Sequence, residues 1–348
     1  MVLLLALTAQ AADLAVIDQV VESGELGEVV AVVVEQGGQV VHHRQYRAGV
    51  HRRGSTSDDP TLHDIRSAGK SLTALAVGAA IEDGHLASTE LVVWPLLGLD
   101  APDGLEDVRV HDLLSMSSAL DCNDWDRRSP GQEERMYRRK DWTRFVARLP
   151  ADASYQRDGQ GVGRFSYCTA GVYLLGQVVE NSVGERFDHY VQRRLLAPMG
   201  IAQVAWRASR SGQIQSGGQL EVSAEALARI GRLVLDGGVW DGRTLLDAAW
   251  VDDMLTERAR VHPEVGYGYL WWRIPVTVDG EMLPCWAMLG NGGNLVLLSE
   301  RQDAVVVVQA ANYNEPTAQQ WSMVPVRMAL TLLEATHETS AERPAQAP

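Results

Sequence analysis

Lysine is nearly absent from this chain of 348 residues, in which Lys70 and Lys140 stand against 29 arginines. Because arginine supplies almost every surface cation, Lys70 is expected to have a task that arginine cannot perform. Arginine stays protonated in proteins, whereas a lysine amine loses its proton more easily when it is desolvated or lies near other cations. Such an amine beside a serine hydroxyl activates the hydroxyl as a nucleophile. Ser67, three residues before Lys70, is therefore the candidate nucleophile.

Sequence signals for metal binding and for membrane insertion are also missing. There is no Cys-x-x-Cys pair and no His-Glu-x-x-His, so a zinc site has no support and we expect no cofactor. No hydrophobic run reaches the length of a membrane-spanning helix. The net charge of −14 argues against a nucleic-acid partner, which normally requires a basic face.

The cysteines are few and leave two interpretations open. Residues 1–12 contain a short apolar run and an Ala-x-Ala site, as at the end of a secretory signal, but lack a basic beginning. We therefore expect a periplasmic or secreted protein, with a cytoplasmic location as the alternative. In an exported protein Cys122 and Cys168 are candidates for a disulfide, with Cys285 left free. The alternative is three buried thiols.

The segment from Arg66 to Gly84 predicts a buried helix that carries Ser67 and Lys70. Small and apolar residues recur at helical spacing, and Gly84 is a typical stop signal. Residues three apart are neighbours on one face of a helix. Ser67, in the first turn, would lie near the positive end of the helix dipole, which favours developing negative charge. The alternative is a capping serine followed by an unrelated lysine.

Apolar, β-rich runs separated by turn residues predict strands at both ends of the chain, and helical spacing predicts helices between them. The predicted strands are 28–35, 39–47, 267–274, 282–289, 294–299 and 304–310. The predicted helices are 13–22, 142–148, 172–181, 187–196, 223–235, 245–255 and 317–335.

This order predicts an α/β (α+β) fold with one mostly antiparallel sheet, formed by both termini and flanked by helices, and an inserted all-helical domain. We assign residues 13–75 and 257–336 to the sheet domain and residues 76–256 to the helical domain. Residues 337–348, rich in Ala, Pro, Glu and Ser, are predicted to be a disordered tail.

Two further segments are candidates for partners of Ser67. Tyr167 lies just before the helix predicted at 172–181, where a loop can hold a phenol over a site; the alternative is a tyrosine packed at an interface. The glycine-rich segment 289–295 leads into a strand, and its glycines permit close approach of the backbone to a ligand. A simple hairpin turn is the alternative there.

Taken in order, Ser67-x-x-Lys70, Tyr167-Cys168-Thr169 and Asn291-Gly292-Gly293 resemble the three motifs of the serine β-lactamase and penicillin-binding-protein superfamily, in particular the class C β-lactamase-like serine hydrolases and esterases. Segments 111–118, 195–201 and 233–243 agree with this resemblance, which covers residues 13–335. It implies a β-lactamase/transpeptidase-like fold and a reaction through an acyl-enzyme.

The resemblance also implies roles for individual residues. Ser67 would be acylated, Lys70 would share its proton chemistry, and Tyr167 would act as general base and then as proton donor to the leaving group. Asn291, Gly292 and Gly293 would form the third motif. The N–H of Asn294 would complete an oxyanion hole with that of Ser67.

Two departures from the superfamily pattern bear on the substrate. The second motif usually ends in Asn, but here ends in Thr169, which lacks an amide. The third motif usually begins with Lys or His, but here begins with Asn291, which removes a cation for a substrate carboxylate. We therefore predict a serine acyl hydrolase for esters or neutral amides. The alternatives are a β-lactamase or D-Ala-D-Ala carboxypeptidase, and a non-catalytic binding protein on the same fold.

Two neighbouring features are given structural interpretations. The acidic loop 121–126 lacks the spacing and glycine of a calcium-binding EF-hand, so we expect a solvated loop at the rim of the site. Of the adjacent Trp271 and Trp272, one is expected to pack in the core and the other to line an acyl pocket.

Overall fold

The computed structural model describes residues 14–55, 57–158 and 163–341. The predicted signal remnant at 1–12 and the end of the predicted tail lie outside these residues. No helix in the described part of the chain is long and apolar enough to cross a membrane.

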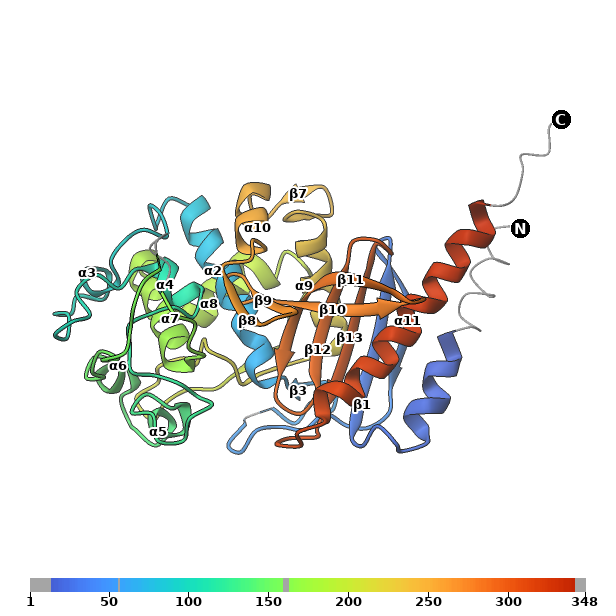
Figure 1. The fold of residues 1–348 in the computed structure, drawn as a ribbon, viewed down its shortest axis with the longest axis horizontal. Helices are drawn as coiled ribbons and strands as arrows, with labels where there is room; N and C mark the ends of the chain where they lie inside the picture. The colour runs from blue at the N-terminus through green and yellow to red at the C-terminus, as the bar shows by residue number, and fades with distance from the viewer. Residues whose placement is uncertain (1–13, 56, 159–162, 342–348) are drawn as a thin grey trace.

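The main sheet has eight antiparallel strands in the order β2-β1-β13-β12-β11-β10-β9-β8 (Figure 1). The hairpin of β1 (Val29–Gln36) and β2 (Gln39–Gln45) comes from the start of the chain, and β1 pairs with β13 (Ala304–Ala310) from its end. The predicted sheet built from both termini is therefore confirmed. The remaining strands are β8 (Ala259–His262), β9 (Val265–Tyr267), β10 (Trp272–Val278), β11 (Glu281–Gly290) and β12 (Asn294–Ser299).

The central strands are nearly continuous apolar runs, and successive residues point to opposite faces, so both faces of the sheet are buried. In β13, Val305 and Val307 belong to one core, and Val306 and Val308 belong to the other. The first face is covered by α9 (Ala224–Leu235), and the second by α11 (Ala318–Ala341) and the helix at residues 14–22. Figure 1 shows α11 running across the sheet in front of these strands.

The segment between the two groups of sheet strands is mainly helical and contains the element that carries Ser67. A 3-10 turn, η1 (Arg66–Gly69), continues directly into α2 (Lys70–Glu82), which is buried along nearly its whole length. The other helices are α3 (Val93–Leu97), α4 (Val110–Leu114), α5 (Glu133–Tyr137), α6 (Trp142–Val146), α7 (Thr169–Val183), α8 (Phe187–Val191), the π-helical turn η2 (Gln192–Leu196) and α10 (Ala248–Met254).

The inserted region is not entirely helical, so this detail of the prediction is corrected. Two small sheets contain β3 (His63–Asp64), β4 (Ala205–Trp206) and β5 (Leu220–Val222), and β6 (Val239–Trp240) with β7 (Arg243–Thr244). Strands of two or three residues are too short to show an alternating pattern in the sequence. The division into domains at 75/76 and 256/257 stays a prediction, and α2 runs across the first boundary without a break.

Two predicted elements differ from the structure. The strand expected at 267–274 is broken into β9 and β10, because Leu270 adopts a positive φ of 60° and its N–H donates to Leu114 O at 3.0 Å. The last helix continues to Ala341, into the segment predicted as a tail. No glycine or proline occurs between Pro325 and Pro344 to stop it.

A buried arginine fastens α9 to the sheet. Arg232 is 5% exposed; its guanidinium donates to Glu35 Oε2 at 2.8 Å, to Asp303 Oδ1 at 2.6 Å and to Asp236 Oδ1 at 3.0 Å. Burial raises the pKa of Glu35, and the hydrogen bond from Arg232 opposes that rise. The ion pair keeps the Glu35 carboxylate from being buried without a partner.

We expect Arg232→Met to lower the free energy of unfolding by about 3–5 kcal/mol, because removal of one partner leaves a buried charge uncompensated. Urea unfolding followed by circular dichroism measures this loss. Arg229→Met is the control, because Arg229 lies on the same helix but is exposed and donates to the carbonyls of Met199 and Gly200. Equal losses in the two variants would contradict the prediction.

Candidate active site

Ser67 and Lys70 are direct hydrogen-bond partners at the junction of η1 and α2. Lys70 Nζ donates to Ser67 Oγ at 2.9 Å, and the Lys70 side chain is buried, with 1% exposure. The sequence produces this contact because residues three apart lie on one side of a helical turn. The predicted proximity is present in the structure, and the catalytic roles of the two residues stay predictions.

The ring of Tyr167 lies beside this pair, and its role as general base stays a prediction. The Lys70 Nζ lies 5.0 Å from the centroid of the Tyr167 ring, within the range of a cation–π contact. The ring stacks between Trp125, at 5.4 Å and an interplanar angle of 3°, and Trp272, at 5.8 Å and 28°. Two aromatic neighbours restrict the phenol to one orientation, which is what a proton-transferring group requires.

The loop at residues 121–126 holds the Tyr167 segment in place. Cys122 and Cys168 form a disulfide with a Cα–Cα distance of 5.4 Å, so the first of the two interpretations of the cysteines is confirmed, and Cys285 is a free, buried thiol. The N–H of Asp124 donates to Tyr167 O at 2.8 Å, and the N–H of Thr169 donates to Asp124 Oδ2 at 2.6 Å. These contacts thus fix the backbone from Tyr167 to Thr169.

Asp124 is a site residue that the sequence did not reveal, because it was assigned to a solvated loop. Its other carboxylate oxygen accepts the N–H of Glu133 at 2.8 Å. Burial and the charge of Glu133 raise the pKa of Asp124 to about 6, while the charge of Lys70 and the hydrogen bond from Thr169 oppose the rise. Asp124 therefore changes charge near neutral pH, close to the candidate catalytic amine.

The third motif forms the turn between β11 and β12, beside the Ser67 segment. The Asn291 side chain accepts the N–H of Asn314 at 2.8 Å and donates to its Oδ1 at 3.0 Å. Gly292 and Gly293 have positive φ, and a Cβ at either would lie within 2.6 Å of Tyr313 or Ser322. These two glycines serve the packing of the turn and do not line the cavity.

Two of the residues expected to bind substrate have side chains that point into the protein. The Asn294 side chain is 1% exposed and donates to the carbonyls of Asn291 at 3.0 Å and Ala310 at 3.3 Å. Thr169 is fully buried at the first position of α7, and its Oγ1 has no hydrogen-bond partner among the described residues. The proposed contribution of the Asn294 N–H to an oxyanion hole stays a prediction.

Two glycines that were not predicted as site residues, Gly290 and Gly218, approach the Ser67 segment closely. A Cβ on Gly290 would lie 2.0 Å from Ile65 O and 3.1 Å from Ala68 N, so only glycine lets the end of β11 lie against η1. A Cβ on Gly218, which has a φ of 133°, would lie 2.7 Å from Arg66 O, and the N–H of Gln219 donates to the same oxygen at 3.0 Å. The nucleophile segment is thus held between β11 and residues 217–219.

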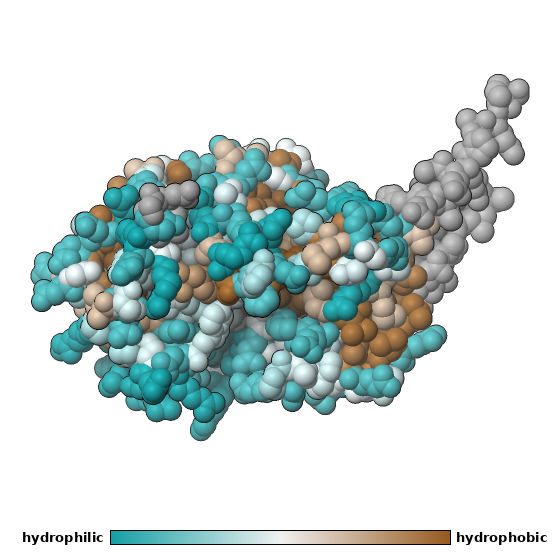
Figure 2. All heavy atoms as spheres, viewed as in Figure 1, coloured by the Kyte–Doolittle hydropathy of each residue, from teal (hydrophilic) through white to brown (hydrophobic). Residues whose placement is uncertain are grey.

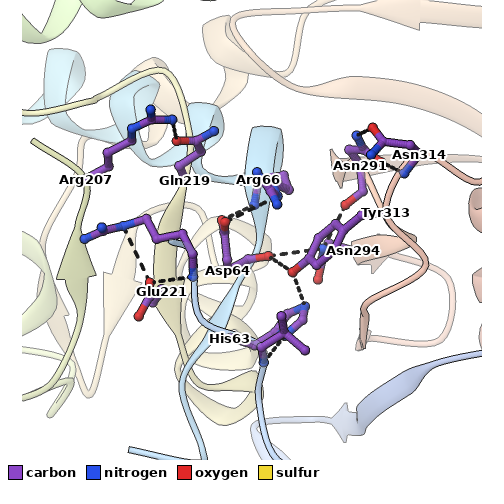
Figure 3. Close-up of polar contacts among 12 residues, drawn as sticks. His63, Asp64, Arg66, Arg207, Gln219, Glu221, Asn291, Asn294, Tyr313 and Asn314 are labelled. Atoms are coloured by element: carbon purple, nitrogen blue, oxygen red, sulfur yellow. Dashed lines mark hydrogen bonds and ion pairs between the residues drawn. The ribbon is translucent and has the colours of Figure 1, made fainter. Parts of the chain in front are cut away.

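A buried polar network lies immediately before Ser67 (Figure 3). The N–H of Arg66 donates to Asp64 Oδ1 at 3.1 Å, and its guanidinium stacks on Tyr313 with the Arg66 Cζ 4.4 Å from the ring centroid. The Tyr313 hydroxyl donates to Asp64 O at 2.8 Å and lies 3.1 Å from His63 Nε2. Burial lowers the pKa of His63 to about 4, so this imidazole is neutral at physiological pH. The network connects the nucleophile segment to the turn after β13.

These residues meet at a cavity of about 1780 Å³. Ser67, Tyr167, Gly290 and Asn291 line it. Trp272 also lines the cavity, whereas Trp271 is fully buried, as predicted for this pair. Within residues 14–55, 57–158 and 163–341, no group of three or more His, Cys, Asp or Glu side chains is arranged to hold a metal ion.

Comparison with known proteins agrees with this geometry. The model of the Beta-lactamase family matches residues 15–322. A 6-aminohexanoate-dimer hydrolase of Paenarthrobacter ureafaciens is 28% identical over 310 residues, which cover 84% of this chain and 74% of that protein.

Solved structures share the fold at lower identity. A penicillin-binding protein from Bacillus halodurans superposes with a TM-score of 0.66 at 21% identity, covering 93% of this chain and 99% of that one. EstCE1, a hydrolase with promiscuous acyltransferase activity, gives a TM-score of 0.66 at 15% identity, covering 94% of this chain and 100% of that one. With a family match over most of its length and this fold, the chain belongs to the beta-lactamase family and is one of its class C-like serine hydrolases.

Proposed function

We propose that the protein hydrolyses esters or uncharged amides through an acyl-enzyme on Ser67. The observation that carries this proposal is the hydrogen bond of 2.9 Å from the buried Lys70 amine to Ser67 Oγ, on the wall of a cavity that also contains Tyr167. A serine hydroxyl next to an amine and a phenol has a route by which its proton can leave as it attacks a carbonyl.

The reaction needs no group beyond those of the chain and water. As Ser67 Oγ bonds to the substrate carbonyl carbon, its proton passes to the Lys70 and Tyr167 pair. Tyr167 then donates a proton to the departing alcohol or amine as the carbonyl reforms. Water then gives a proton to the same pair as its oxygen attacks the acyl-enzyme, and the pair returns this proton to Ser67 Oγ as the acid leaves. The N–H groups of Ser67 and Asn294 are assigned to the oxyanion of each tetrahedral intermediate.

The surroundings of the reacting carbonyl favour an uncharged acyl group there. Asn291 stands where the superfamily often has a cation, and its amide is engaged by Asn314. The stacked aromatic rings of Trp125, Tyr167 and Trp272 offer an apolar wall. The relatives support an amide among the substrates, because they include a 6-aminohexanoate-dimer hydrolase.

Ser67→Ala is expected to lower turnover of 4-nitrophenyl butyrate by at least about a thousandfold, because the nucleophile is lost while the cavity remains. Release of nitrophenol measures the rate, and the exposed Ser154→Ala is the control. Retained turnover in Ser67→Ala would disprove the assignment. Rapid labelling of Ser67 by a fluorescent penicillin, followed by fast release, would instead favour the β-lactamase alternative.

Lys70→Arg is expected to lose activity by at least about a hundredfold, because a guanidinium keeps the charge but cannot take up a proton. The measurement is kcat on the same ester, with circular dichroism to establish that the variant is folded. Lys140→Arg, the same substitution at the exposed second lysine, should leave kcat unchanged. A folded and active Lys70→Arg enzyme would overturn the proposed proton transfer.

Asp124 predicts a pH dependence. Its pKa is raised to about 6, so the carboxylate gains a proton as the pH falls below that value and loses the charge that accepts the N–H of Thr169. We expect kcat to fall on the acid side with an apparent pKa near 6. In Asp124→Asn, whose side chain has no charge at any pH, kcat should be lower and that acid limb should disappear. The same limb in both enzymes would exclude Asp124 as its origin.

A further inference from the structure

The segment 127–148 reverses the charge of the chain. The protein as a whole has a net charge of −14, yet this segment contains eight cations and only three carboxylates. It forms α5, α6 and the turns around them. Figure 2 shows hydrophilic side chains over the lower left of the molecule, where Figure 1 places α5.

Most of these cations line the same cavity as Ser67. Six of them, here called the arginine arm, are Arg127, Arg135, Arg138, Arg139, Arg144 and Arg148. At about 1780 Å³ the cavity exceeds the roughly 300–1000 Å³ of an ordinary small-molecule site. It therefore has room for a substrate that reaches from the Ser67 hydroxyl into the arginine arm.

The arginine arm is not neutralised by the protein. None of its six members forms an ion pair with the part of the chain that the structure describes. Arg128, the neighbour that does not line the cavity, does pair with Asp126. Unpaired guanidinium groups along one concave wall create a positive potential that a bound anion can use.

The carboxylates on the same wall are mostly engaged elsewhere. Asp124 accepts the N–H groups of Thr169 and Glu133, and Glu133 accepts the hydroxyl of Tyr137 at 2.8 Å. Asp141 caps α6 by accepting the N–H of Arg144 at 3.0 Å. With Glu134 these make four lining carboxylates, against eight lining cations (the six arginines of the arm, Lys140 and Arg66), so positive charge exceeds negative charge on the wall of the cavity.

We propose that the arginine arm binds an anionic group of the substrate, a carboxylate or a phosphate, at a position separate from the scissile bond. Guanidinium groups suit this task because their planar donors pair with two oxygens of either anion. This inference rests on the proposed hydrolysis at Ser67 and specifies its substrate class. The substrate is an ester or amide that is uncharged next to its reacting carbonyl and acidic at its far end.

Three esters with a common leaving group test the inference. They are 4-nitrophenyl hexanoate, mono-4-nitrophenyl adipate, and the 4-nitrophenyl ester of 5-phosphonopentanoic acid. We expect kcat/KM for at least one anionic ester to exceed that for the hexanoate by about tenfold at low salt. An ionic strength of about 0.5 M should remove most of this preference. The ratio of the two anionic esters distinguishes carboxylate from phosphate.

Two variants with the same change in net charge provide the comparison. In the first, Arg138, Arg139, Arg144 and Arg148 are all replaced by Gln, and the preference for anionic esters should fall to near one while kcat/KM for the hexanoate is kept. In the second variant, four exposed arginines that do not line the cavity are replaced by Gln, and the preference for anionic esters should remain. Those control positions are Arg53, Arg128, Arg210 and Arg243.

The outcomes separate this inference from the proposed function. The inference alone would be overturned if hydrolysis depends on Ser67 but the wild type shows no preference for anionic esters. Equal losses of that preference in the two fourfold variants would also overturn it. If the wild type hydrolyses none of the esters faster than Ser67→Ala does, the proposed function fails. Calorimetric binding of the adipate ester to Ser67→Ala, with and without the four Gln substitutions of the arm, then decides the inference, and equal affinities would refute it.

Discussion

The hydrogen bond between Lys70 and Ser67 requires a buried amine, and distant parts of the fold supply the groups that surround it. An amine that is 1% exposed has little contact with water, so neighbouring groups must stabilise its charge. The ring of Tyr167 faces it, and the charge of Asp124 lies close enough to interact with it. Further along α2, small residues allow equally close packing, as at Gly78, where a Cβ would lie 2.1 Å from the indole of Trp250.

The nucleophile segment is held by parts of the chain that are distant in sequence. Arg66 has a positive φ of 52°, a conformation that costs energy for any residue with a side chain. Hydrogen bonds from Gln219 to Arg66 O and from Arg66 N to Asp64 Oδ1 stabilise it, and Gly290 of β11 lies against the other side. The sheet made from both termini therefore also completes the site.

The parts of the site that follow from local rules were predictable. The proximity of Ser67 and Lys70 depends only on helical spacing, and the antiparallel sheet follows from short apolar runs separated by hairpin turns. Tyr167 required the resemblance, because nothing local distinguishes it from other tyrosines. Asp124 and residues 217–219 were missed because their positions are fixed by tertiary contacts, such as the Cys122–Cys168 disulfide, that leave no periodic pattern.

Lysine and arginine suit different roles in this chain, and the chemistry of their side chains explains the difference. A charge that must move with a proton cannot be carried by a guanidinium, so the buried position beside Ser67 requires lysine. A charge that must stay in place and pair with two oxygens is best carried by arginine, which is what lines the far wall of the cavity. The third motif adds no cation, because it begins with Asn291. The proposed hydrolase discriminates between substrates by charge away from the carbonyl, and its acyl transfer takes place beside the Lys70 amine and the rings of Tyr167 and Trp272.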